Sequence, residues 1–429
     1  MRTLGKWLAL CLMLAMMPID GIANDTVRMT WIADAGSKSF SFTGTKDVDF
    51  TIDWGDGNIE TVTATGNKKK CSHIYTDAGT YEALLLGKTG AARILELDCS
   101  YVKVMALNVK TCTALMALTC WGNQLSFVDV SNNTALAFLN CSMNWLPSID
   151  ISSNTALREL NCGSNRLFSL DVSNNTALTS LVCANNHMSS IDVNNNTVLT
   201  YLDCSTNHIS SLDVSNNAAL RELNCGSNRL FSLDVSNNTA LTSLVCANNQ
   251  LMMIDISKNT ALKSLNFSNN RFTVIDVGNN MALTYLGCSD NSLSSIDVSN
   301  NTALTSLECS NNQLTSLDVV SNSKLTTLDC SGNNFGQWEN IRLNEELIVL
   351  NCSDNHLSTI DVSPNMVLKS LRCSNNQLSA IDVSSNASLM FLYCSNNQLT
   401  SLDVVSNSKL TTLDCSGNNF GQWEKYPFE

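Results

Sequence analysis

The chain has 429 residues and is acidic, with a net charge of −13 at pH 7. Nucleic acids and anionic membrane surfaces repel such a charge, so we exclude both as partners. Aromatic residues make up only 6% of the sequence. That is few for one large hydrophobic core, and it favours many small, similar cores.

Residues 1–23 have the pattern of a secretory signal peptide. Two basic residues precede an apolar run from Trp7 to Met17, and small residues close the segment. The run is too short to span a bilayer. We therefore expect an exported protein, secreted or held at a bacterial cell surface, that begins at Asn24 and does not insert into the membrane.

Residues 24–90 contain short alternating segments that predict strands: KSFSFTG, DVDFTIDWGDGN, IETVTAT and HIYTDAGTYEALLLG. The Gly-Asp-Gly turn at 55–57 predicts a hairpin. Together with the segments 73–75 and 78–81, this turn resembles a PKD-type β-sandwich domain of bacterial surface proteins. The resemblance implies a spacer or a cap, in which the aspartates around the turn either bind calcium or only form the turn.

From residue 91 to residue 429 the sequence repeats about every 21 residues. Each repeat follows L-x-x-L-x-C-x-x-N-x-L and continues with residues close to T-S-L-D-V-S-N-N-T-A. Cysteine fills fifteen of sixteen equivalent positions, from Cys99 to Cys415, and Phe267 fills the other. This period and leucine spacing predict a mainly β protein: a leucine-rich-repeat solenoid of about 16 coils with a parallel sheet, after the small β-sandwich.

Three parts of the repeat region depart from the pattern. The first coil, residues 91–112, is degenerate, with Asn108 in place of the repeated aspartate and Cys112 in place of an asparagine. The coil at 331–351 is irregular because it contains one additional residue. The aromatic tail at 420–429 is expected to cover the last core.

Each half of the repeat predicts a local structure. The L-x-C half alternates inward and outward and predicts a short strand. The asparagine three residues after each cysteine is expected to adopt tight-turn dihedrals and to bond backbone groups of its own coil and the next. The L-D-V-S-x-N half predicts a second short strand or an extended segment on the opposite side, turned by a second asparagine.

The cysteine column has three explanations. Zinc needs four converging ligands, whereas one column offers at most two adjacent thiols. In-register neighbours keep their Cβ atoms about 4.8 Å apart, beyond the roughly 3.8 Å that a disulfide favours. We therefore favour packing, in which cysteine acts as a small buried hydrophobe, although free thiols are unusual in exported proteins.

Aspartates form another column, from Asp129 to Asp318 and then at Asp361, Asp382 and Asp403. Their carboxylates either accept turn N–H groups while solvated or bind a ladder of cations such as calcium. Apart from calcium, we expect no cofactor.

Histidine does not indicate a catalytic or metal site in this sequence. His187, His208 and His356 occupy one equivalent position that other coils fill with Gln, Arg or Ser. No Ser-His-Asp, Cys-His or paired-carboxylate arrangement is recognisable. We therefore expect a protein that is not an enzyme.

The outward positions of the cysteine strand are the residues four, three and one before each cysteine and the one after it. Most are small or polar, and scattered larger residues on a surface need no explanation. Exposed aromatic and Arg side chains are nevertheless frequent binding anchors. The candidate ligand-binding residues are Trp121, Phe138, Trp145, Arg158, Tyr201, Arg221, Tyr285, Arg372, Phe391 and Tyr393.

The period and the phases of cysteine and asparagine resemble the internalin family of bacterial surface proteins, in its internalin J type with a cysteine ladder. The resemblance covers residues ~91–424. It implies a binding protein used in adhesion to host material or to other bacteria in a biofilm, with a protein or glycoprotein ligand. The PKD-like domain replaces the helical cap of that family. We expect a monomer.

Two other functions remain open. One is carbohydrate recognition, helped by the aspartate column and the exposed aromatic residues. The other is a structural rod of an extracellular matrix with no defined ligand.

Overall fold

The computed structural model describes residues 24–337 and 345–421, and every regular element in these ranges is a β-strand. The predicted signal peptide at 1–23, part of the irregular coil and most of the aromatic tail lie outside them. Within the same ranges, no helix has the length and hydrophobicity needed to cross a bilayer. The chain divides into two compact units, one up to Leu220 and one from Arg221, which are described separately.

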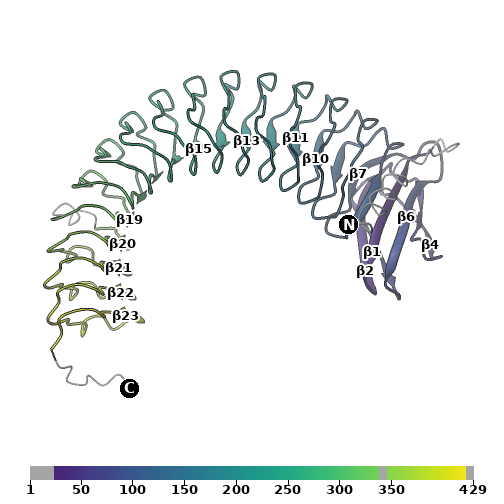
Figure 1. Ribbon diagram of the computed structural model, residues 1–429. Helices are drawn as coiled ribbons and strands as arrows, with labels where there is room; N and C mark the ends of the chain where they lie inside the picture. The colour runs from purple at the N-terminus through teal and green to yellow at the C-terminus, as the bar shows by residue number, and fades with distance from the viewer. Residues whose placement is uncertain (1–23, 338–344, 422–429) are drawn as a thin grey trace, which may run out of the picture. The chain divides into compact units, whose positions relative to one another are not determined.

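The first unit begins with two sheets that pack face to face (Figure 1). One sheet has the order β4-β3-β6-β1-β8, and the other contains β5, β2 and β7 as neighbours. Aromatic side chains fill the space between them, as in the contacts of Trp31 with Phe40 and of Phe42 with Phe50. The strands are β1 (Thr26–Ala33), β2 (Gly36–Gly44), β3 (Asp49–Asp53), β4 (Ile59–Thr63), β5 (Lys69–Tyr75), β6 (Gly79–Gly87), β7 (Ile94–Asp98) and β8 (Val104–Asn108).

The expected turn at 55–57 joins β3 to β4. Gly55 has a φ of 81°, and a Cβ at this position would lie 2.4 Å from the Glu82 carbonyl oxygen, so the turn requires glycine. Asp53 accepts the Gly55 N–H at 2.9 Å, and the Asp56 carboxylate lies 2.6 Å from His73 Nε2. Asp53 therefore has a partner within the turn, and Asp56 has a partner on β5.

The sandwich does not end at residue 90. The strand β7 pairs with β2 of the sandwich and also with β9 of the first full repeat, while β8 pairs with β1. The two sides of the first coil thus continue the two sheets. In this coil Asn108 accepts the Lys110 N–H at 3.0 Å, as an aspartate does in later coils. The N-terminal sheets cover a core that the first coil would otherwise expose to water.

The rest of the first unit contains one three-residue strand per repeat. Their central leucines, Leu118 to Leu202, pair in register and parallel. The strands are β9 (Ala117–Thr119), β10 (Phe138–Asn140), β11 (Glu159–Asn161), β12 (Ser180–Val182) and β13 (Tyr201–Asp203). From β9 to Leu220, the described return halves form extended segments with one isolated bridge, between Asp171 and Asp192, and no second strand.

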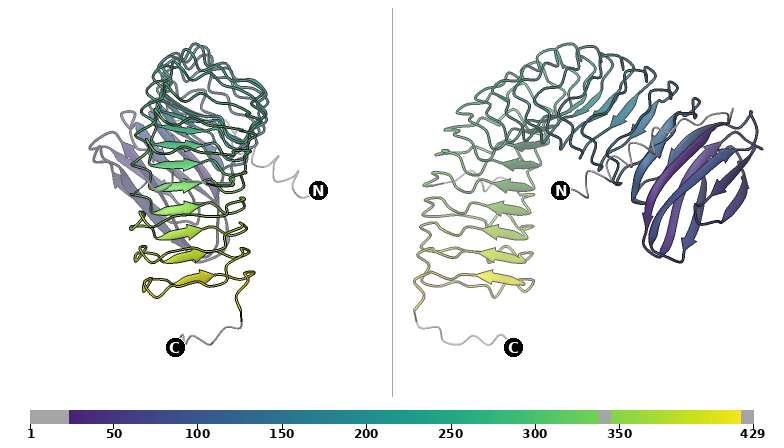
Figure 2. Two further views of the ribbon diagram at one scale, coloured as in Figure 1. Left: turned by 90° about the vertical axis from the view of Figure 1, so that its left-hand side faces the viewer. Right: turned by 45° about the vertical axis from the view of Figure 1, so that its right-hand side comes forward.

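The second unit continues the same repeat (Figure 2). The additional residue of the irregular coil does not disturb the sheet. Leu328 pairs in register with Leu350, although the two are 22 positions apart and not 21. The strands are β14 (Glu222–Asn224), β15 (Ser243–Val245), β16 (Ser264–Asn266), β17 (Tyr285–Gly287), β18 (Ser306–Glu308), β19 (Thr327–Asp329), β20 (Val349–Asn351), β21 (Ser370–Arg372), β22 (Phe391–Tyr393) and β23 (Thr412–Asp414).

The cysteine column lies in the core of each unit. No disulfide joins the described cysteines, and all of them are buried except the half-buried Cys415. Some thiols donate to a carbonyl of the next coil, as Cys162 does to Val182 at 3.6 Å. Phe267 replaces cysteine in the coil where Phe272 replaces leucine, and the two rings pack 4.7 Å apart. The column therefore fills the core beside the sheet.

The asparagine after each strand bridges two coils. Asn165 donates from Nδ2 to the carbonyls of Cys141 (3.0 Å) and Cys162 (3.1 Å), and its Oδ1 accepts the Leu146 N–H at 3.0 Å. The expected bonding within its own coil is confirmed, but the second coil is the preceding one and not the next. The expected dihedral is also corrected. The left-handed residue is one position earlier, as at Ser164 with φ 54°, so the tight turn precedes the asparagine.

The aspartates of the return side cap turns. Asp150 Oδ1 accepts the Ser152 N–H at 3.0 Å, and Asp171 Oδ1 accepts the Ser173 N–H at 2.9 Å. These hydrogen bonds from Ser152 and Ser173 hold the pKa of each carboxyl below its ordinary value of 3.8. Across the part of the chain that the structure covers, no three His, Cys, Asp or Glu residues gather as metal ligands.

Asn165→Ala is expected to lower the free energy of unfolding by about 2–4 kcal/mol, because it leaves buried carbonyl and amide groups without partners. The control is Asn174→Ala, since Asn174 is exposed and donates one bond of 3.3 Å to Ser152. Urea unfolding followed by circular dichroism measures both variants. Equal stability of the two variants would contradict the bridging role.

The native protein is expected to react slowly with a thiol reagent at pH 8, and the sixteen buried thiols should react only on unfolding. Burial raises the pKa of Cys141 to about 12, so almost no thiolate is present. A Cys415→Ser variant should lose the most reactive site. Rapid labelling of all thiols in the native protein would show that the column is accessible.

The protein is expected to lose stability in acid below about pH 4. The carboxyls of Asp150 and Asp171 have lowered pKa values when folded. The stability that they contribute is therefore complete above 3.8 and is lost as pH falls through the folded values. Urea midpoints across pH measure this, and an Asp150→Asn, Asp171→Asn variant should lose part of the dependence. A midpoint lowered by chelator at pH 7 would instead indicate bound cations.

Candidate functional site

The outward face of each parallel sheet is formed by the first and third residues of its three-residue strands. The central leucine is buried, as Leu160 is in β11, while its neighbours Glu159 and Asn161 are exposed or half-buried. Because coils stack in register, equivalent outward residues form rows along the sheet. We call this surface the sheet face.

Four candidate residues of the first unit lie on or beside the sheet face. Phe138 and Tyr201 are the first residues of β10 and β13 and are half-buried. Arg158 precedes β11 and is exposed. Trp121 follows Cys120, and the Tyr101 ring packs edge-on against it at 4.2 Å. Three of these four side chains are therefore only partly available to a partner.

Trp145 lies elsewhere. It is four residues after Cys141, in the turn that follows the strand, and 46% of it is exposed. The Arg166 guanidinium lies 5.6 Å from the centre of its ring. Trp145 therefore belongs to the loop edge of the coils, and its expected place on the sheet face was wrong because this position is not among the outward ones.

In the second unit, Arg221 precedes β14 and is exposed, and Tyr285 is the first residue of β17. The Tyr285 hydroxyl donates to Glu308 Oε2 at 3.0 Å. Burial, together with this carboxylate, raises the pKa of Tyr285 to about 12. Tyr285 is therefore held in place by Glu308.

The structure brings Arg372, Phe391 and Tyr393 together on the sheet face. Arg372 and Tyr393 are cross-strand partners in β21 and β22, and the guanidinium lies 5.1 Å from the ring centre. Phe391 is on the same strand as Tyr393, two residues earlier, and is 37% exposed. Residues two apart on a strand point to the same side. This cluster therefore presents a cation and two aromatic rings on one surface.

Several exposed apolar residues on the return side were not predicted. They lie at positions where most coils have Ser or Thr. This departure from the repeat is the sequence signal that could have identified them. They are Phe168 in the first unit and Phe231, Met252, Met253 and Val274 in the second.

Solved structures with the same repeat support the family assignment. The functional domain of InlJ from Listeria monocytogenes, which includes a cysteine ladder, is 36% identical, with a TM-score of 0.72 over 74% of this chain and 70% of that chain. A leucine-rich-repeat protein of Leptospira interrogans is 22% identical, with a TM-score of 0.61 over 73% of this chain and 81% of that one.

A third similar structure is YopM from Yersinia enterocolitica, which is 24% identical with a TM-score of 0.61 over 72% of this chain and 68% of that chain. At such identities the Leptospira and Yersinia proteins show a shared fold only. No protein-family model and no curated protein matches the chain. The repeat, the buried cysteine column and the similarity to InlJ together show that the chain belongs to the internalin family of leucine-rich-repeat proteins, in its cysteine-ladder type.

Proposed function

We propose that the protein is an exported, surface-associated adhesin that binds a protein or glycoprotein of host or bacterial surfaces and has no enzymatic activity. Its role would be attachment to host material or to other cells in a biofilm. The observation that carries the proposal is the cluster of Arg372, Phe391 and Tyr393 on the sheet face.

The cluster has the chemistry of a binding anchor. Aromatic and Arg side chains dominate the energetics of many interfaces. The guanidinium over the Tyr393 ring fixes the orientation of both groups before a ligand arrives. Serine and threonine at neighbouring outward positions, such as Ser370 and Thr412, leave the cluster open to a partner.

Export and surface location rest on the predicted signal peptide and on family membership. Carbohydrate recognition is the second candidate, because exposed aromatic rings also stack on sugars; the experiment below separates it from protein recognition.

A variant with Arg372→Ala, Phe391→Ala and Tyr393→Ala is expected to bind intact host or bacterial cells at least ~30-fold more weakly than the unchanged protein. The loss of interface anchors weakens binding by such factors. Flow cytometry with labelled protein measures this. Thr327→Ala, a half-buried outward position on β19, is the matched control.

Loss of binding after enzymatic deglycosylation of the cells would identify a glycan ligand. Unchanged binding of the triple variant would refute the assignment to this cluster. Attachment that survives both treatments would favour the structural rod.

A further inference from the structure

A second surface of the second unit departs from the repeat on the return side. Phe231, Met252, Met253 and Val274 are 56–74% exposed. Main-chain bonds from Gln250 to Leu230 and from Arg271 to Leu251 stack these coils, so Phe231 lies next to Met252, and Met253 next to Val274. We call these four residues the apolar patch. Equivalent positions of the next two coils are Ser294, Ser295, Thr315 and Ser316.

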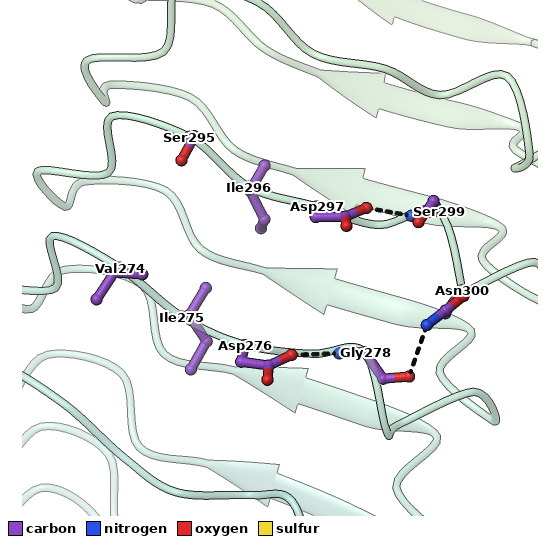
Figure 3. Close-up of a pocket in the computed structure, with 9 residues that line it drawn as sticks. All are labelled: Val274, Ile275, Asp276, Gly278, Ser295, Ile296, Asp297, Ser299 and Asn300. Atoms are coloured by element: carbon purple, nitrogen blue, oxygen red, sulfur yellow. Dashed lines mark hydrogen bonds between the residues drawn. The ribbon is translucent and has the colours of Figure 1, made fainter.

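A pocket of about 240 Å³ opens beside the apolar patch (Figure 3). Val274 belongs to both. The nearly buried side chains of Ile275 and Ile296 line it, and Asp276 and Asp297 lie on neighbouring coils at the same edge (Figure 3). The volume is below the roughly 300 Å³ minimum of sites for drug-sized ligands, so it suits a single side chain.

One residue that lines the pocket departs from the repeat. Gly278 stands where the coils on either side have Ser257 and Ser299. A Cβ at Gly278 would lie 3.1 Å from Asp276 Oδ1 and 3.6 Å from Asn300 Nδ2, inside the lining of the pocket. The glycine therefore leaves space between the two coils that a serine would reduce.

The residues that line the pocket include two carboxylates and no basic side chain, and Lys258 lies on the preceding coil, one residue after the equivalent of Gly278. From residue 272 to residue 323 the chain carries five acidic residues and no Lys, Arg or His. Asp276 and Asp297 each accept a main-chain N–H with Oδ1, from Gly278 at 2.8 Å and from Ser299 at 2.9 Å. Their Oδ2 atoms therefore remain as acceptors for a ligand.

From this geometry we propose a second binding site, in which the pocket takes a lysine or arginine side chain of a protein partner and the apolar patch takes large apolar residues beside it. The methylene groups lie on Val274, Ile275 and Ile296, and the cation lies between Asp276 and Asp297. The apolar contact supplies most of the affinity, since exposed ion pairs contribute little. The carboxylates select for positive charge.

The test uses a short synthetic peptide with one lysine between leucine and phenylalanine, and two copies in which norleucine or glutamate replaces the lysine. Binding to the protein lacking residues 1–23 is measured by fluorescence anisotropy. We expect the lysine peptide to bind with a Kd on the order of 100 µM. The norleucine peptide should bind about threefold more weakly, which is the size of an exposed ion pair, and the glutamate peptide more weakly still.

Two variants return the site to residues that other coils already have, so they preserve the fold. Gly278→Ser, and Met252→Ser with Met253→Ser, should each weaken lysine-peptide binding about tenfold. The control Val405→Ser removes an exposed apolar residue from a distant coil and should bind as the unchanged protein does. The variant of the Arg372 cluster should also bind normally, which separates this site from the sheet face.

Four outcomes would overturn the proposal: equal binding of the lysine and norleucine peptides, no binding at millimolar concentration, no effect of Gly278→Ser, or self-association lost in the Met252→Ser, Met253→Ser variant. Sedimentation of the protein alone detects the last, which would assign the apolar patch to a second copy of the chain.

Discussion

A single coil of this protein cannot pair all the hydrogen-bonding groups of its backbone, and it cannot bury its own leucines. The Asn165 side chain bonds the carbonyls of Cys141 and Cys162 and the amide of Leu146, which come from two coils. Each coil is therefore complete only when the next one lies on it in register. This constraint explains why the leucine and asparagine phases hardly change, and why the additional residue before Leu350 is absorbed outside the sheet.

The same constraint leaves the outward positions free. A residue that points away from the core and makes no bond between coils can be exchanged without disturbing the stack. Most coils keep small or polar residues there, and two groups of larger residues in the second unit depart from this background. One is the cluster around Tyr393 on the sheet face, and the other is the apolar patch next to Gly278. A regular background makes such departures informative, because packing does not explain them.

The sequence predicted those features that follow from periodicity. The parallel sheet, the burial of the cysteines and the bridging asparagines all depend on alternation or on a fixed phase. The strand β1 was missed because it lies between β6 and β8 and is buried along most of its length, so its residues do not alternate clearly. The left-handed position was assigned to the wrong residue because Ser164, Asn185 and Thr206 occupy it, and none is glycine.

Features that depend on contacts between distant segments could not be predicted from the sequence. With the domain boundary placed at residue 90, the pairing of β7 and β8 with the strands of the sandwich was not expected. Most of the ten candidate residues lie on or beside the strands, as expected. Only the structure shows that Arg372 lies over the Tyr393 ring and that Tyr285 is held by Glu308. The pocket beside Val274 is lined partly by Gly278, and a search for large residues cannot find a position where a side chain is missing.

The buried thiol column also makes unfolding harder to reverse in an oxidising medium. In the folded chain every described thiol except that of Cys415 is buried, and burial keeps such thiols protonated, as at Cys141, so oxidants hardly reach them. When several coils open together, neighbouring thiols become thiolates within reach of one another and cross-link in wrong pairs. A cross-linked segment can no longer restack, so the open state is removed from the equilibrium. The lifetime of such a protein is then set by how rarely its coils separate, and the rate of opening matters more than the free energy of folding.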